Sequence, residues 1–459
     1  MPRKFPLTGT DPITRTQLDM PGLVPPPTSW PLLLLLWGLG LPSLAAGTPA
    51  RAEAPHAADL AWWQAGQPEH SSPGSRNTAD WLRWLAKRRS FTWRGVPYGL
   101  TGLPVGYYSG LSGWNYGGRV KLTDYSRRPF RYKLTFNWVQ STRDRLDLFM
   151  RLRIPSLAGT QWGLNLQLDY YQGLRPYYGL GNNTLYDPRL TDPGSSLFVN
   201  RDYYSYRIHK PRMLFTLMRP IRYPFFIAAG FGLKHVDIRP PAQSSRLFEE
   251  QLFSPGEGSS GLVGVMVRWD TRDDETLPRR GALHEWSYES AHNSLLGLLL
   301  PQIGFSRYTF SDIRFFPLTS RLNLANRAVF EIMQGTVPVD VMGDLGGLRR
   351  KIKGLGGDET LRGYDTNRFI DRVRYFSNTE LRYTLRRQTL LRQYLEWTGV
   401  AFVDLGRVWP DLKSLTLAGI HLTGGGGVRA YWNEDFVASL EGRFSTERRL
   451  LAFSLGNIF

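Results

Sequence analysis

Arg362 lies in a stretch rich in glycine and charge, GGDETLRGYDTNRF, at residues 356–369. An arginine guanidinium forms paired, charge-assisted hydrogen bonds to carboxylates, so the chemistry on offer here is ion pairing. Gly363 lets the backbone turn tightly beside the guanidinium, and Tyr364 supplies a ring that packs on a neighbouring wall. An isolated Arg-Gly-Tyr sequence is more often an exposed turn, so its meaning depends on the elements that position it.

Residue types that catalyse reactions or bind metals do not form a recognisable motif. The seven histidines are scattered and lack the His-Glu-x-x-His spacing of a zinc site. The chain has no cysteine, which excludes disulfides and thiolate metal sites, and it has no Gly-x-Ser-x-Gly elbow. The sequence therefore predicts no enzyme, no cofactor and no metal site.

Alternation with period two dominates the chain from about Tyr98 onward. In RYKLTFNWV, residues 131–139, apolar and aromatic residues alternate with Lys133, Thr135 and Asn137. The segments 145–154 and 162–170 repeat this design. Because successive side chains of a strand point to opposite faces, each segment predicts a strand with one apolar and one polar face.

The character of the two faces distinguishes a membrane barrel from a soluble sandwich, which also alternates. The polar faces carry charges that a dry core would reject, and the apolar faces often begin or end in Trp or Tyr, as a membrane-interface girdle does. The mean hydropathy of −0.32 argues against many helical spans. We therefore predict an all-β fold, a transmembrane antiparallel β-barrel over residues 98–459.

The N-terminal region is predicted to direct the chain out of the cytoplasm. Residues 29–47 hold an apolar stretch of roughly fifteen residues, short of the roughly twenty that a spanning helix needs. Basic residues precede it and small residues follow it, as in a secretory signal, although a membrane anchor is the alternative. We assign residues 1–52 to the signal peptide region and residues 53–97 to a short helical or irregular periplasmic extension or plug.

The C-terminus has the pattern of a final strand. In LLAFSLGNIF, Phe453, Leu455 and Phe459 fall on one face and Gly456 falls on the other. In an outer-membrane barrel the last strand closes against the first, so that no edge remains. We interpret Phe453, Leu455, Gly456 and Phe459 as a candidate C-terminal assembly signal.

Five stretches in chain order resemble the BamA/TamA superfamily of outer-membrane assembly and translocation proteins. They are VRWDTRDDETLPRRG (267–281), LRGYDTNRF (361–369), NTELRY (378–383), AFVDLGRVW (401–409) and FSLGNIF (453–459). Phe402, Asp404 and Gly406 match the Phe-x-Asp-x-Gly strand pattern of that family. Each motif alone is weak, but five in order are specific, and a stretch that resembles a first strand at 102–118 extends the resemblance over the barrel.

The resemblance implies a barrel of about 16 strands with an inward-folded loop, in which Arg362 pairs with Asp404. Alternation agrees, because it places Phe402, Asp404 and Gly406 on the inner face. Glu380, on the polar side of its own strand, is a competing partner for Arg362. A barrel lumen is polar and partly wet, so this ion pair is expected to contribute about 1–2 kcal/mol.

The resemblance also implies a function, which is to assist insertion or translocation of proteins or lipids at the bacterial outer membrane. Its partners would be client outer-membrane proteins or the barrel assembly machinery. Well-known members carry periplasmic POTRA domains, which residues 53–97 are too short to supply, so client delivery is less secure than the fold. The alternative is a passive, anion-favouring pore, because the formal net charge is +18.

The basic residues do not indicate nucleic-acid binding. They alternate with apolar residues along strands and do not cluster with aromatic residues on one surface. A lumen, or a loop crown beside outer-membrane lipids and anionic lipopolysaccharide, explains them better.

Overall fold

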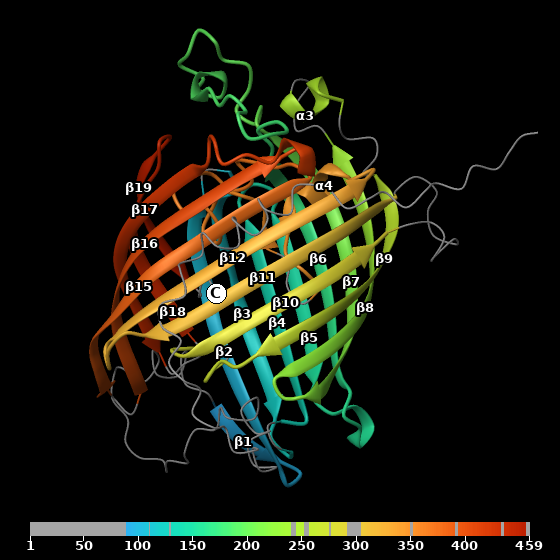
Figure 1. Ribbon diagram of the computed structural model, residues 1–459, viewed down its shortest axis with the longest axis vertical. Coiled ribbons are helices and arrows are strands. Elements are labelled where there is room, and N and C mark those ends of the chain that lie inside the picture. Colours follow the sequence, from blue (N-terminus) through green and yellow to red (C-terminus); the bar gives the residue numbers. More distant parts are fainter. Residues whose placement is uncertain are drawn as a thin grey trace, which may run out of the picture.

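The computed structural model describes residues 89–109, 111–127, 130–239, 245–251, 257–274, 277–291, 304–348, 352–390, 393–432 and 436–455. Long, tilted strands curl around a lumen in these residues (Figure 1). The expected signal peptide region and most of the expected periplasmic extension lie outside the described residues.

The main sheet has 17 strands, and each pairs antiparallel with its neighbours along the chain. The strands are β1 (Arg89–Trp93), β2 (Val96–Ser109), β3 (Gly113–Asp124), β4 (Tyr132–Ser141), β5 (Leu146–Ile154), β6 (Gly163–Pro176), β7 (Ser205–Arg222), β8 (Phe225–Arg239), β9 (Gly258–Asp270), β10 (Gly281–Ser290), β11 (Phe305–Pro317), β12 (Leu322–Gly335), β15 (Val373–Leu390), β16 (Gln393–Trp409), β17 (His421–Trp432), β18 (Phe436–Phe444) and β19 (Arg449–Leu455). Since β1 is a short addition to β2, sixteen strands form the wall, and the predicted all-β antiparallel fold is confirmed.

The closed seam expected from the C-terminus is not formed within the described residues. Ladders run from β2 through to β19, but no ladder joins β19 to β2 there. Part of the β2 edge is instead taken by β1, because Arg89–Trp93 pair with residues 96–100. β1 therefore occupies part of the β2 edge that β19 was expected to cover.

β1 also differs from the helical or irregular segment expected before Tyr98. Phe91 and Trp93 alternate with Ser90 and Thr92, which is the period of a strand. The intervening turn has positive φ at both Arg94 (50°) and Gly95 (78°), the backbone shape of a two-residue hairpin. The alternation of polar and aromatic residues in SFTW, followed by Arg-Gly, was the sequence signal for this hairpin.

Side chains alternate between an apolar outer face and a polar inner face. On β4 the outer residues Phe136 and Trp138 are exposed, whereas the inner Thr135 is buried. On β16 the outer Val403 is exposed and the inner Phe402 is buried. The exposed apolar set is the surface that a membrane barrel presents to lipid.

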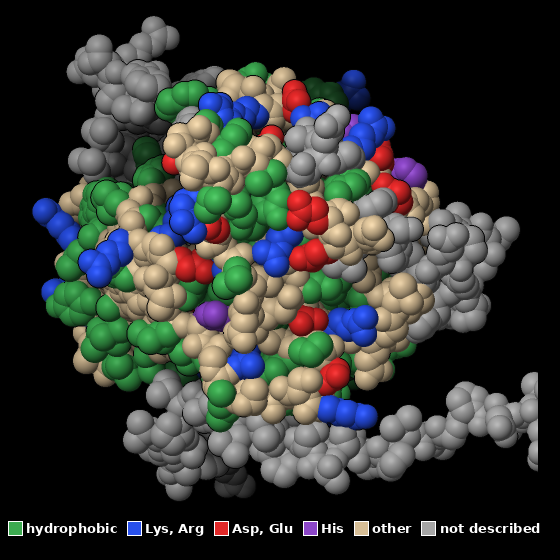
Figure 2. Space-filling model, turned by 90° about the horizontal axis from the view of Figure 1, so that it is seen from above, with side chains coloured by type: hydrophobic (Ala, Val, Ile, Leu, Met, Phe, Trp, Pro, Cys, Tyr) green, Lys and Arg blue, Asp and Glu red, His purple; other side chains and the backbone are tan. Residues whose placement is uncertain are grey.

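The two ends of the wall differ in their connections. The loop end carries residues 177–204 with η3 (Pro188–Leu190), the β8–β9 connection with α3 (Arg246–Glu249), and the β16–β17 connection with η5 (Leu412–Ser414). Basic, acidic and hydrophobic side chains are interspersed over this end (Figure 2). The opposite turn end carries mostly short connections, among them Tyr223–Pro224 between β7 and β8 and a longer one with η2 (Leu157–Gly159).

Helices contribute little to the described parts of the chain. Within those parts no helix is both long and apolar enough to cross a membrane.

Residues 336–372, here called the lumen segment, join β12 to β15 and fold inward. The segment contains α4 (Val339–Met342) and a small hairpin of β13 (Asp344–Leu345) and β14 (Ile352–Lys353). Six of its apolar residues form a buried cluster with three residues of the wall: Leu345, Ile352, Leu355, Leu361, Tyr364 and Phe369 with Val329, Phe376 and Val408. The segment is therefore packed on its own core, which positions the charged residues described next.

Candidate functional site

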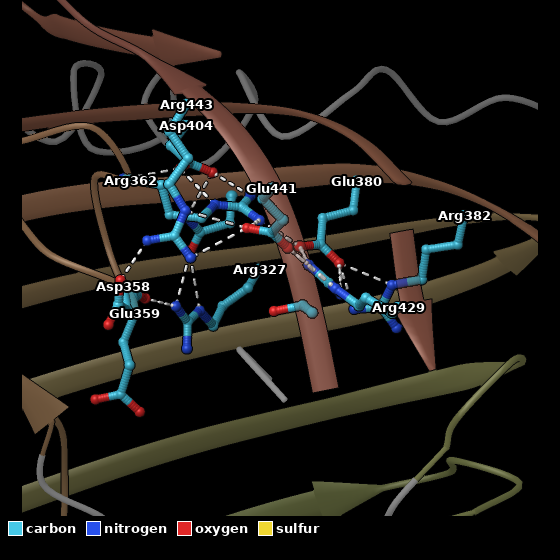
Figure 3. A network of polar contacts seen from close by, with 12 residues as sticks. Arg327, Asp358, Glu359, Arg362, Glu380, Arg382, Asp404, Arg429, Glu441 and Arg443 are labelled. Atoms are coloured by element: carbon cyan, nitrogen blue, oxygen red, sulfur yellow. Dashed lines mark hydrogen bonds and ion pairs between the residues drawn. The ribbon is translucent and has the colours of Figure 1, made fainter. Parts of the chain in front are cut away.

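Arg362 lies at the tip of the lumen segment and binds two carboxylates of the wall (Figure 3). Its Nε and Nη2 donate to the two oxygens of Asp404 on β16, at 2.8 and 2.7 Å. Its backbone N–H donates to Asp404 at 3.1 Å, and its Nη1 donates to Glu380 on β15 at 2.7 Å. The expected partner and its competitor therefore bind the same guanidinium together.

Asp404 is held in place by the strands on both sides. Asn378 on β15 and Thr423 on β17 lie directly opposite it in register. The Asn378 amide donates to Asp404 at 2.8 Å, and the Thr423 hydroxyl donates at 3.2 Å. Since Asn378 also donates to the carbonyl of Thr360 at 2.6 Å, one side chain ties the lumen segment to the wall and orients the carboxylate.

Further arginines extend this ion pair into a network across β15, β17 and β18. Glu380 accepts from Arg382 at 2.8 Å and from Arg429 at 2.6 and 2.9 Å. Glu441 accepts from Arg429 at 2.9 Å and lies 3.9 Å from Arg362. Arg443 pairs with both Glu441 and Asp358, so the network returns to the lumen segment.

The centre of the network around Arg362 is dry, which corrects the partly wet site expected from the sequence. The side chains of Arg362, Glu380 and Asp404 have no exposed surface. Burial alone would lower the pKa of Arg362, but the charges of Asp404 and Glu380 outweigh it and raise that pKa above its usual value. Water is excluded because the apolar cluster of the lumen segment and the wall packs around the tip.

Two aromatic residues of the site have different contacts: Phe402 packs on the guanidinium, and Tyr364 packs within the lumen segment and bonds the β18–β19 connection. The Arg362 guanidinium carbon lies 3.5 Å from the centre of the Phe402 ring, a close cation–π contact. The Tyr364 hydroxyl shares a hydrogen bond of 2.9 Å with the Thr446 hydroxyl, and its ring packs edge-on against Phe369. Phe402 therefore helps to fix the direction of Arg362, and Tyr364 fixes the backbone beside it to the β18–β19 connection.

The two glycines of the site are required by space and backbone shape. Gly363 has φ of +116°, a conformation that other residues rarely adopt, and a Cβ there would lie 3.3 Å from the Phe444 backbone. A Cβ on Gly406 would lie 2.4 Å from the Leu355 side chain. The missing side chain at Gly406 therefore leaves room for Leu355 of the lumen segment against the wall.

A second cluster, which the sequence analysis did not identify, fixes the first half of the lumen segment. Asp340 in α4 binds Lys234 on β8 at 2.6 Å and Lys210 on β7 at 3.0 Å. Asp344 binds Lys210 at 2.6 Å and Arg175 on β6 at 2.9 Å. We call these five residues the acidic clamp.

Arginines of the nearer wall hold the same stretch through its backbone. Arg307 on β11 donates to the carbonyl of Val341 at 2.9 Å. Arg374 on β15 donates to the carbonyls of Met342 and Asp344 and pairs with Glu331 on β12. The lumen segment therefore joins β6, β7 and β8 to β15, β16 and β18, which lie on distant parts of the wall.

The comparison with known protein families supplies the deciding observation. A model of the Omp85 superfamily domain matches residues 156–419, more than half of the chain. The chain belongs to the Omp85 superfamily. Proteins of this superfamily are β-barrels of the bacterial outer membrane, so the resemblance inferred from five short motifs is confirmed for the barrel.

One solved structure supports the Omp85 fold, and a second is similar over part of its length. BamA from Haemophilus ducreyi lacking POTRA domains 1–3 matches with a TM-score of 0.50 and 12% identity, over 86% of this chain and 81% of that one. CdiB from Escherichia coli matches with a TM-score of 0.47 and 12% identity, over 78% of this chain and 61% of that one. No curated protein matches the chain by sequence.

The remaining predicted residues of this Omp85 chain lie at its last strand. Phe453 on β19 is 63% exposed and so lies on the outer face. β19 ends at Leu455, whereas Gly456 and Phe459 lie outside the described residues. Their role as an assembly signal stays a prediction.

The charged side chains of the Omp85 site form ion pairs with one another. In the described ranges no group of three or more His, Asp or Glu is arranged to hold a metal ion. These ion pairs hold the lumen segment at two places, the Arg362 network and the acidic clamp.

The acidic clamp should release the lumen segment of this Omp85 barrel at low pH. Burial by itself would raise the pKa of Asp340, but Lys234 and Lys210 outweigh it and lower that pKa to about 2. A carboxyl whose pKa is lower in the folded state stabilises that state above about pH 4, and this contribution, roughly 2 kcal/mol, is lost as pH falls from about 4 to about 2. Pepsin cleavage within residues 336–348 should therefore rise over this range.

Two substitutions test the origin of this acid dependence. Asp340→Asn should make the same stretch cleavable throughout the range, whereas Asp192→Asn, in an exposed loop, should behave as the unmodified chain does. An Asp340→Asn variant with the unmodified pH profile would show that another group is responsible.

Proposed function

We propose that this Omp85 protein assists insertion or translocation of proteins at the bacterial outer membrane, with lipids as a second class of cargo. The observation that carries the proposal is the lumen segment, which buried ion pairs fix to distant parts of the wall. Burying charges costs free energy unless each charge is paired, and a passive pore does not require such buried ion pairs. A lumen segment fixed in this way suits a barrel whose wall must keep its shape while client proteins bind to it.

The partners in this proposal are client outer-membrane proteins or the barrel assembly machinery, within a membrane of lipids and lipopolysaccharide. Superfamily membership and the BamA-like fold support it, as does the β2 edge above β1, which pairs with no strand of the described residues. The protein acts by holding and guiding chains, without enzymatic chemistry. The N-terminal signal peptide, read from residues 1–52, delivers it to the periplasm.

Depletion in the native host tests the proposal. Loss of the protein should lower the amounts of particular outer-membrane proteins in quantitative proteomics of isolated membranes. The unmodified gene should restore these amounts, and a gene with Arg362→Ala should restore them poorly even when its product reaches the membrane. An unchanged outer-membrane proteome after depletion would contradict the assembly function.

One observation favours a second candidate, an anion-favouring pore. The inner faces of β3, β4 and β5 carry cations in register, with Lys133 opposite Arg153 and Thr135 between Lys121 and Arg151. A basic lumen attracts anions. Conductance of the purified barrel in a planar bilayer distinguishes the two functions: large, steady, anion-selective currents from the unmodified protein would favour the pore.

A further inference from the structure

We infer that a collar of arginines at the turn end binds the anionic headgroups of phospholipids. The collar consists of Arg219 and Arg222 on β7, Arg321 between β11 and β12, and Arg386 on β15. This inference goes beyond the proposed function and does not depend on it.

Two β-bulges place collar arginines on the outer face. The β7–β8 register shifts between Pro220 and Arg222, so that Arg222 lies opposite the outward-facing Phe225. A bulge in a strand redirects the side chains that follow it. The bulged residue itself, Ile221, is apolar and 59% exposed.

The same device recurs on β15. The β15–β16 register shifts between Thr384 and Arg386, so that Arg386 lies opposite the outward-facing Trp397. Here too the bulged residue is apolar and exposed, since Leu385 is 49% exposed. Two separate strands therefore each present an exposed apolar residue, an arginine and an aromatic partner at the same end of the wall.

The other two arginines lie in similar surroundings. Arg219 lies opposite the outer residue Ile227, and its guanidinium lies over the Trp162 ring at 5.6 Å. Arg321 is exposed and directly precedes β12, close to the exposed Phe316 and Leu318. Trp and Tyr gather at the membrane–water interface, so Trp162 beside Arg219 and Trp397 opposite Arg386 place the collar at the level of the headgroups.

Charge complementarity identifies the ligand. Within the described residues none of the four collar arginines forms an ion pair with an acidic side chain. Three arginines at the loop end differ, because Arg189, Arg207 and Arg239 pair with Asp187, Asp144 and Asp237. The four collar arginines thus present uncompensated positive charge at the turn end.

The common level of the four arginines on the wall fits a lipid layer as the occupant. The four residues extend from β7 across β8 to β12 and on to β15, and all lie at the turn end of the wall. A layer of headgroups that surrounds the wall at this level contacts all four. In outer-membrane barrels the short turns lie on the periplasmic side, and arginine is well tolerated near the interface although costly at the midplane.

Lipid selectivity of the full chain tests the collar. The protein is placed in nanodiscs that contain phosphatidylcholine with a small share of phosphatidylglycerol, and the lipids retained on it are counted by native mass spectrometry. Each arginine near an anionic surface contributes about fivefold in affinity. We expect phosphatidylglycerol to be enriched severalfold over its bulk share, and Arg222→Gln/Arg321→Gln/Arg386→Gln to reduce the retained ratio to the bulk value.

A matched control separates the collar from net charge. Arg189→Gln/Arg207→Gln/Arg239→Gln removes the same charge at the loop end and should leave the enrichment unchanged. Unchanged enrichment in the collar variant, or equal loss in both variants, would overturn the inference. Heat-dependent gel migration shows which variants are folded, and if the triple collar variant is not, Arg222→Gln and Arg386→Gln are tested singly, each with a loss of up to about fivefold.

Discussion

Replacing Arg362 with alanine should lower the free energy of unfolding by about 3–5 kcal/mol, because it leaves the buried Asp404 and Glu380 carboxylates without their shared partner. Urea unfolding of the purified barrel in detergent gives this value directly. Protease cleavage within residues 358–367 should rise in parallel, since the tip of the lumen segment loses its anchor.

Two further variants show whether Arg362 and Asp404 act as a pair. The double variant Arg362→Ala/Asp404→Ala should lose much less stability than the sum of the two single variants, because the shared interaction is lost only once. Arg239→Ala, an exposed residue of the loop end, should stay within about 0.5 kcal/mol of the unmodified chain. Strict additivity of the single losses would show that the two side chains are energetically independent.

Glu380→Ala should cost at least as much, toward the upper end of about 3–5 kcal/mol, because this carboxylate serves three arginines. Its removal leaves Arg362, Arg382 and Arg429 with too few negative charges nearby. The temperature at which the folded band is lost on a gel, together with urea unfolding, measures the effect.

A compensating substitution tests this charge balance. Arg429→Ala added to Glu380→Ala removes one of the stranded cations, so the double variant should recover part of the loss. If Glu380→Ala were as stable as the unmodified chain, or if the second change only added to the damage, the network would not be governed by charge pairing.

The alternation of side chains made much of this site predictable. Strand periodicity placed Phe402, Asp404 and Gly406 on the inner face, where the structure has them, because the period of a strand is independent of distant parts of the chain. The same rule placed Glu380 as a competitor of Asp404. It had no means of showing that the two carboxylates bind one guanidinium from opposite sides.

The acidic clamp was beyond the reach of sequence patterns for a different reason. Asp344 and Lys210 are 134 residues apart, and Arg175 and Asp344 are 169 apart, so only the curvature of the wall brings them together. The signal that was present is small: two aspartates four positions apart, Asp340 and Asp344, in an otherwise apolar stretch. The dryness of the site likewise depends on packing by Leu355 and Leu361, which a polar inner face does not reveal.

Each strand of the wall pairs with the strands next to it in the chain, and this sets the order in which contacts form during folding. Hairpins between consecutive strands close short loops and form early, whereas the clamp on the lumen segment must wait until β6, β7 and β8 have curved toward it. Interactions that form after the rate-limiting step slow unfolding and leave the folding rate nearly unchanged. The acidic clamp therefore acts as a kinetic latch, which lengthens the life of the finished barrel without hastening its assembly.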